Sequence, residues 1–279
     1  MFAVIVASLG YAGGVVADKF VLCKYKVPVM RFLPLQFIWL SIITAIFLTR
    51  WGSFDMGSFL EWKYIALFIL MILVAVNWNI LYSQGIQKED LHEFELIMLL
   101  SPLVTIIFAT IFLPAERNWS VFIPGIIATG ALLATRFRAH HVRISKVAWR
   151  TLIAMVLMSL ESIIIKELLG ALSPVALYFA RTTIIAVVFL IMFKPKLLEM
   201  HRNAFALAIL SAIFGVVQMV LKFYGFQSLG VIETTMILVL GPFLVYLASS
   251  MFFKEHVYKR DIFAAAVVVM CILYVQFWR

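Results

Sequence analysis

Long apolar segments separated by short polar ones make up almost the whole chain, and this pattern restricts its possible folds more than any single motif. A helix needs about 20 apolar residues to cross a bilayer core of about 30 Å. With 65% hydrophobic and 13% charged residues, the chain is far more apolar than soluble domains, which have about 45–50% and 25%. Because the segments lack the alternation of barrel strands, we predict an all-α integral membrane protein.

Ten membrane-spanning helices are predicted, divided into two groups of five by a basic linker at 138–146. The first five-helix repeat covers 1–137 and the second covers 147–279. Because five is odd, the second repeat enters the membrane from the other side, and the two form an inverted repeat. The predicted spans are Phe2–Leu22, Phe32–Thr49, Tyr64–Gly85, His92–Leu113, Trp119–Thr135, Val147–Leu169, Pro174–Phe193, Ala204–Leu229, Val231–Phe253 and Ile262–Trp278.

The two halves also share a sequence pattern at a constant offset of 140 positions. The stretch from Tyr82 to Glu116 returns between Lys222 and Glu255. The matching pairs are Gly85 with Gly225, Glu93 with Glu233, and Pro102 with Pro242. A period of half the chain indicates two copies of one structural unit.

Basic residues are unevenly divided between the two sides of the predicted membrane domain. Loops after the odd-numbered spans hold fifteen Lys and Arg residues, whereas the opposite side holds only Arg50, Lys63, Arg117 and Arg279. The positive-inside rule therefore predicts cytoplasmic basic loops and both termini outside, in a multi-pass protein of the cytoplasmic membrane. The net charge of +9 is explained in this way without a nucleic-acid partner.

The helix pattern resembles that of the EamA family of the drug/metabolite transporter superfamily. The resemblance rests on Ser101–Glu116, on its repeat at Gly241–Glu255, and on Lys19 and Lys166 late in spans one and six. It implies a ten-helix carrier of small metabolites, with the substrate path between the halves. Many relatives export amino acids or related compounds. Members are often drawn with cytoplasmic termini, which differs from the orientation that the basic loops of this chain predict.

Spans six and seven carry a charged pair deep in the predicted bilayer. Glu161 lies near the middle of span six and Arg181 about two turns into span seven. Such charges face a protein interior or a wet cavity. One interpretation is mutual neutralisation as a structural pair; the other is that substrate or proton exchange at Glu161 alternately satisfies Arg181. Tyr178 shares a helical stripe with Arg181. In the functional case, Arg181→Ala or Gln218→Ala lowers flux more than folded yield.

Spans three and eight supply further candidate binding residues. Span eight has a stripe of small and polar residues that includes Gln218 and Lys222. At matching places, span three offers Asn77, Trp78, Asn79 and Tyr82. Amides beside aromatic rings can hold a small polar substrate. The alternative is polar bonding between packed helices.

Two acidic residues and two prolines are candidates for gating or coupling. Glu93 and Glu233 begin spans four and nine, where a carboxylate is also favoured simply by the helix dipole. Pro102 and Pro242 each remove a backbone hydrogen bond and permit either a hinge or a static kink.

We therefore predict a secondary transporter that exports a small polar metabolite, an amino acid or related compound, by alternating access. Two alternatives stay open: a proton-coupled exporter of organic cations or drugs, and an integral-membrane enzyme. No catalytic motif and no metal-ligand spacing stands out, so we expect no catalytic residues, metal or cofactor. The expected partners are the small-molecule substrate and the lipid bilayer, with the protein a monomer or homodimer.

Overall fold

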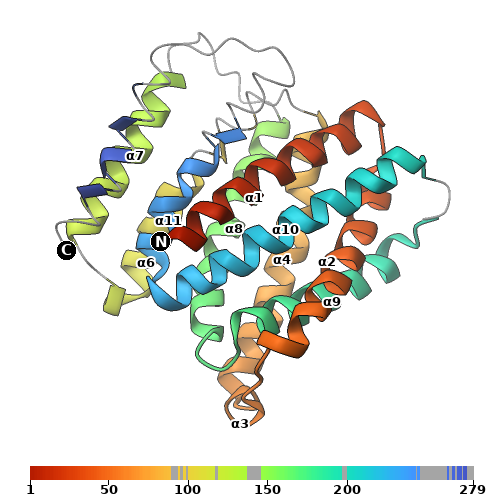
Figure 1. Cartoon of the computed structure of the whole chain (residues 1–279), viewed down its shortest axis with the longest axis horizontal. Coiled ribbons are helices and arrows are strands. Elements are labelled where there is room, and N and C mark those ends of the chain that lie inside the picture. Colours follow the sequence, from red (N-terminus) through yellow and green to blue (C-terminus); the bar gives the residue numbers. More distant parts are fainter. Residues whose placement is uncertain are drawn as a thin grey trace.

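A computed structural model shows a bundle of helices (Figure 1). It describes residues 1–88, 100–116, 119–136, 146–196 and 200–242, with scattered positions between 94 and 98 and between 244 and 274. The elements are α1 (Phe2–Lys19), η1 (Phe20–Lys24), α2 (Val29–Trp51), α3 (Met56–Phe59), α4 (Trp62–Lys88), α6 (Ser101–Phe112), η2 (Pro114–Glu116), α7 (Trp119–Arg136), α8 (Lys146–Leu168), α9 (Pro174–Phe193), α10 (Arg202–Ser228) and α11 (Val231–Leu238). The all-helical fold is confirmed for this part of the chain, whose described loops hold a single isolated β-bridge, Phe54 to Leu172.

Five of the described helices are long and apolar enough to cross a membrane. They are α1 with η1, α2, α4, α9 and α10, and they coincide with predicted spans one, two, three, seven and eight. Helices α7 and α8 occupy the places of spans five and six. Predicted spans four and nine contain the shorter α6 and α11. Most of the tenth span and of the 138–146 linker lies outside the described residues.

Local sequence explains where helices α9 and α11 begin. The Ser173 hydroxyl accepts a hydrogen bond from the Ala176 amide, and Pro174 occupies the first turn of α9, where its missing N–H costs nothing. Helix α11 follows Gly230, whose φ of 87° is readily adopted only by glycine. Both starts are therefore fixed by residues adjacent in sequence.

One end of the bundle collects the C-terminal ends of α1 and α4 and the start of α10; we call it the Lys88 face. Lys19 Nζ donates to the Ile86 carbonyl at 2.9 Å, and the Tyr25 ring stacks on His201 at 5.6 Å. Exposed basic residues gather in these segments and in the stretch that follows α9 (Pro174–Phe193): Lys24, Lys26, Lys88, Lys194, Lys196 and Arg202.

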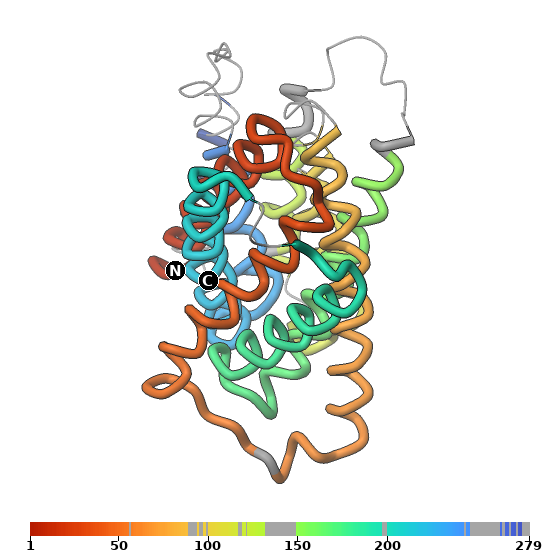
Figure 2. The backbone as a smooth tube through the Cα atoms, turned by 90° about the vertical axis from the view of Figure 1, so that its right-hand side faces the viewer, coloured from red at the N-terminus to blue at the C-terminus, as the bar shows by residue number. Residues whose placement is uncertain are grey.

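The opposite end, which we call the Glu116 face, collects the starts of α4, α9 and α11 and the ends of α2, α8 and α10. Ser53 N donates to Ser173 Oγ at 2.9 Å, and Lys63 pairs with Glu167 at 2.8 Å. The segment joining α2 to α4 lies at this end (Figure 2). Helices α4 and α8 are therefore antiparallel.

Helices from the two halves of the chain pair across the bundle. The most extensive pairings are α1 with α10, α4 with α8, and α2 with α9, and α1 and α10 lie side by side (Figure 1). Gly10 permits the first of these contacts: a Cβ there would lie 3.0 Å from both Phe214 O and Gln218 N. The close approach brings Gln218 into the centre of the bundle.

Candidate functional site

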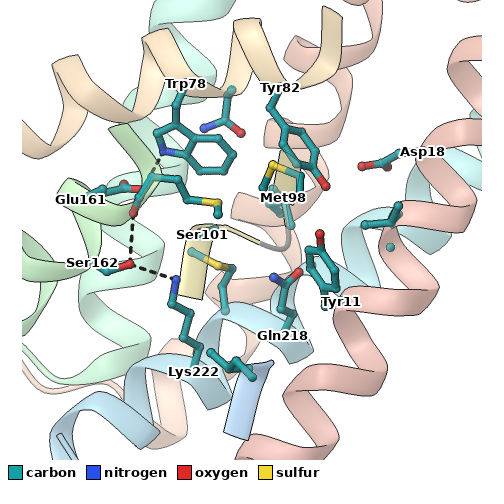
Figure 3. A pocket seen from close by; sticks show the side chains of 18 of the residues that line it. Tyr11, Asp18, Trp78, Tyr82, Met98, Ser101, Glu161, Ser162, Gln218 and Lys222 are labelled. Atoms are coloured by element: carbon teal, nitrogen blue, oxygen red, sulfur yellow. Dashed lines mark hydrogen bonds between the residues drawn. The ribbon is translucent and has the colours of Figure 1, made fainter. Parts of the chain in front are cut away.

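A cavity of about 160 Å³ lies inside the bundle between the two halves (Figure 3). Its walls come from α1, α2, α4, α6, α8, α9, α10 and α11, with single residues at 98 and 242. The volume is close to that of a protein cavity of about 150 Å³ that holds benzene. The space therefore suits a molecule of about six to ten non-hydrogen atoms.

Most of the residues selected from the sequence line this cavity. They are Trp78, Asn79, Tyr82, Pro102, Glu161, Tyr178, Arg181, Gln218, Lys222 and Pro242. Asn77 does not join them, because its side chain is exposed and its amide donates to the Leu73 carbonyl at 2.8 Å. Glu233 is buried in the first turn of α11 and is not among the lining residues. Glu93 lies outside the described residues.

Glu161 and Arg181 form a bidentate ion pair in the cavity wall. Arg181 Nε donates to Glu161 Oε1 at 2.7 Å, and Nη2 donates to Oε2 at 3.3 Å. Trp78 Nε1 donates to the same Oε2 at 2.7 Å, and the guanidinium lies 5.8 Å from the Trp78 ring centroid. Glu161 and Arg181 are 1% and 2% exposed. The two charges thus satisfy each other and have little capacity left for a ligand.

Lys222 is a cation of the cavity with weaker partners. Its Nζ donates to Ser162 Oγ at 3.2 Å and lies 5.1 Å from the Phe226 ring centroid. No acidic side chain of the described chain forms an ion pair with it. Figure 3 shows the lysine extending into the cavity beside Ser162. It is the best-placed residue for an anionic group of a bound molecule.

Asp18 forms a second polar cluster that the sequence analysis did not select. Its Oδ1 accepts from Gln36 Nε2 at 3.2 Å and from the Ser211 hydroxyl. Gln36 Nε2 also donates to Ser211 Oγ at 2.8 Å. The cluster joins α1, α2 and α10, and α2 contributes Gln36 to the cavity wall. A signal was present, because Tyr11, Gly14 and Asp18 form a helical stripe of the kind seen in span eight.

Aromatic rings form much of the remaining wall. The Trp78 and Tyr82 rings meet edge to face at 5.8 Å, and the Tyr178 and Phe223 rings do so at 5.7 Å. Tyr11 and Tyr82 both extend into the open space in Figure 3. Such rings can pack against the apolar part of a small ligand while the polar clusters hold its charged groups.

Both prolines selected as gating candidates, Pro102 and Pro242, lie next to breaks in helical structure. Leu100 is in a turn and α6 begins at Ser101, so Pro102 occupies the first helical turn, where proline leaves no donor unsatisfied. Helix α11 ends at Leu238, and the chain turns at Val239 before Pro242. The prolines therefore follow helix interruptions, and their role as a hinge or a static kink stays a prediction.

Glu116 links the first half of the chain to the second at the Glu116 face. Its Oε2 accepts from the backbone N of Val231 at 2.5 Å and of Ile232 at 3.4 Å. Its Oε1 lies 3.2 Å from Lys166 Nζ, which also donates to the Phe226 carbonyl at 2.6 Å. The carboxylate thus caps α11, where the helix dipole favours a negative charge.

The fold and the cavity together define a class: an all-helical membrane protein whose two halves enclose a polar, aromatic-lined site. The model of the EamA-like transporter family matches residues 1–137 and again 145–277. The chain therefore belongs to the EamA family of the drug/metabolite transporter superfamily, and the resemblance found in the sequence is confirmed.

Similarity to a solved structure supports the fold. One protein of known crystal structure superposes with a TM-score of 0.78 at 14% sequence identity. The superposition covers 99% of this chain and 97% of the chain of that protein. At this identity the likeness concerns the fold alone. A search of curated proteins finds no match.

Proposed function

We propose that the protein is a secondary transporter that moves a small polar metabolite, of the size of an amino acid, out of the cell by alternating access. The observation that carries this proposal is the cavity of about 160 Å³ between the two halves, which is lined by Lys222 and Asp18 without ion-pair partners in the described chain. Family membership supplies the class of transporter. The cavity supplies the size and polarity of its cargo.

Ten spans in two inverted halves are the architecture that we propose for this movement. The reciprocal pairing of α1 with α10 and of α4 with α8 supports it. Helix α1 runs towards the Lys88 face, as the contact between Lys19 and Ile86 indicates. Helix α8, the first of the second half, runs towards the Glu116 face, where Lys166 contacts Phe226. Halves of opposite orientation can rock around a site held between them.

The Lys88 face is proposed to be cytoplasmic. Exposed lysines and arginines concentrate there, whereas the described basic residues of the Glu116 face are Arg50, Lys63 and Lys166. Positive loops favour the cytoplasmic side. A phosphatase reporter fused after Arg279 is expected to be active and a fluorescent-protein reporter dark; the reverse result would contradict this orientation.

Opening of the Glu116 face is expected to require loss of the Glu116 contacts with α11 and Lys166. Glu116→Gln should weaken them and raise, several-fold, the rate at which an impermeant maleimide labels Thr235→Cys from that face. The background protein would lack the two free cysteines, Cys23 and Cys271.

Glu167→Gln is the matched control for this experiment, because Glu167 lies at the same face in an exposed pair with Lys63. It should leave the labelling rate unchanged. Equal rates in the Glu116 variant, the control and the parent protein would show that Glu116 only stabilises the fold.

Transport itself can be tested by finding a ligand and following its movement. A thermal-shift screen of amino acids, amines, sugar phosphates and nucleobases should give a compound that stabilises the folded protein. In sealed proteoliposomes that compound should then show saturable flux and be recovered unchanged. Conversion of the compound by detergent-solubilised protein would instead support an integral-membrane enzyme.

A proton-coupled exporter of organic cations is the second candidate. The observation that favours it is Asp18, a buried carboxylate at the cavity without a cationic partner in the described chain. Because Glu161 neutralises Arg181, the charge of that arginine opposes a cationic cargo only weakly. Lys222 opposes a purely cationic cargo, since like charges repel in a low-dielectric cavity.

A further inference from the structure

Asp18 is held in one orientation with part of its carboxylate unused. The side chain is 8% exposed, and both of its hydrogen bonds, from Gln36 and Ser211, go to Oδ1. Oδ2 has no hydrogen-bond partner in the described chain, and the residue lines the cavity. An ionised carboxylate carries about four acceptor positions. The cluster is therefore a pre-oriented acceptor with unfilled capacity.

No protein cation compensates Asp18 within the described residues. Lys19, its neighbour in sequence, turns away to the Ile86 carbonyl. Arg181 is bound to Glu161, and Lys222 contacts Ser162. A buried carboxylate without a counter-charge is unfavourable. A ligand that brings a positive charge removes this penalty.

The cavity is thus lined by an acidic and a basic side chain, neither of which has an ion-pair partner among the described residues. Figure 3 shows Asp18 on the side of α1 and Lys222 on the opposite side, with Tyr11, Tyr82 and Gln218 between them. This arrangement complements a molecule that has a cationic group at one end, an anionic group at the other and a small apolar body.

We propose that Asp18, oriented by Gln36 and Ser211, is the subsite that binds the ammonium group of the cargo, while Lys222 binds its anionic group. The cargo is then a small zwitterion, and Asp18 selects it over simple carboxylates. The naming of this ligand as cargo rests on the proposed transport function. Binding of an ammonium group at Asp18 does not depend on that function, because it can be measured on purified protein.

Two minimal probes test the subsites separately: ethylammonium chloride and sodium propanoate, each carrying one of the two charges. Binding is measured as saturable thermal stabilisation in detergent, with choline chloride and sodium chloride at equal ionic strength as references. Wild-type protein should bind both probes. Asp18→Asn should bind ethylammonium at least tenfold more weakly and retain propanoate, whereas Lys222→Met should show the reverse selectivity.

Asp18→Ser is a second charge-removing variant in case the asparagine variant misfolds, and retained propanoate binding shows that the site is intact. Glu167→Gln, which removes an exposed carboxylate, should change neither affinity. The proposal is overturned if wild-type protein does not bind ethylammonium, if the Asp18 variants bind it normally, or if sodium ions stabilise Asp18-containing protein equally well. Failure of vesicle flux with these affinities intact would reject transport and leave the ammonium subsite standing.

Discussion

Replacing Arg181 with alanine is expected to destabilise the protein by about 3–5 kcal/mol, because it leaves the carboxylate of Glu161 buried without its counter-charge. Both side chains are almost fully inaccessible, and the pair is bidentate. Measurement of thermal unfolding and of folded yield in detergent should show the loss. Flux should fall together with yield, whereas the sequence alone favoured a larger effect on flux.

A double variant separates loss of the pair from loss of one charge. Glu161→Gln with Arg181→Met removes both charges, and the glutamine oxygen can still accept from Trp78 Nε1, which now donates to Glu161 at 2.7 Å. Most of the stability should return, because neutral replacements for a buried ion pair are often tolerated. This rescue would identify the pair as structural.

Lys63 and Glu167 provide the control, since they form an ion pair between α4 and α8, the helix that also carries Glu161, but with side chains 60% and 40% exposed. Lys63→Ala should cost less than about 1 kcal/mol. If Arg181→Ala lowers the free energy of unfolding no more than Lys63→Ala does, the Glu161–Arg181 pair is not required for stability.

Lys222→Met should have the opposite profile: loss of binding without loss of stability. Methionine preserves the length and volume of the side chain but removes a partly buried cation that has no ion-pair partner in the described chain, so the unfolding temperature should stay the same or rise. A hydrogen bond to a charged group contributes about 1.5–3 kcal/mol, which corresponds to roughly a tenfold to hundredfold weaker affinity for an anionic group. Thermal-shift titration with propanoate measures this directly.

Two further variants sharpen the result for Lys222. Lys222→Arg keeps the charge and should retain part of the binding, whereas Lys24→Met, at an exposed lysine of the Lys88 face, should affect neither property. Unchanged propanoate affinity in Lys222→Met would remove the lysine from the proposed anion subsite. A fall in stability as large as the fall in affinity would assign it a structural role.

The charged residues of the cavity wall could be predicted from the sequence because the patterns that reveal them are local. Glu161 and Arg181 are conspicuous in apolar helices, and the stripe through Gln218 and Lys222 follows from helical periodicity. The sequence does not show which of Asn77 and Asn79 lines the cavity. The two differ by about 200° around a helix, and packing turns Asn79 towards the cavity and Asn77 away from it.

What the sequence determined by itself was the membrane class, the internal duplication and the family, because apolar length and repeated patterns are properties of the chain in one dimension. Tertiary structure decided which charges are satisfied. Arg181 forms an ion pair with Glu161, whereas Asp18 accepts hydrogen bonds from Gln36 and Ser211. Glu116 caps a helix that begins more than a hundred positions later. Such partners depend on how helices pack across the two halves, and helix packing is fixed by the fit of side chains distant in sequence.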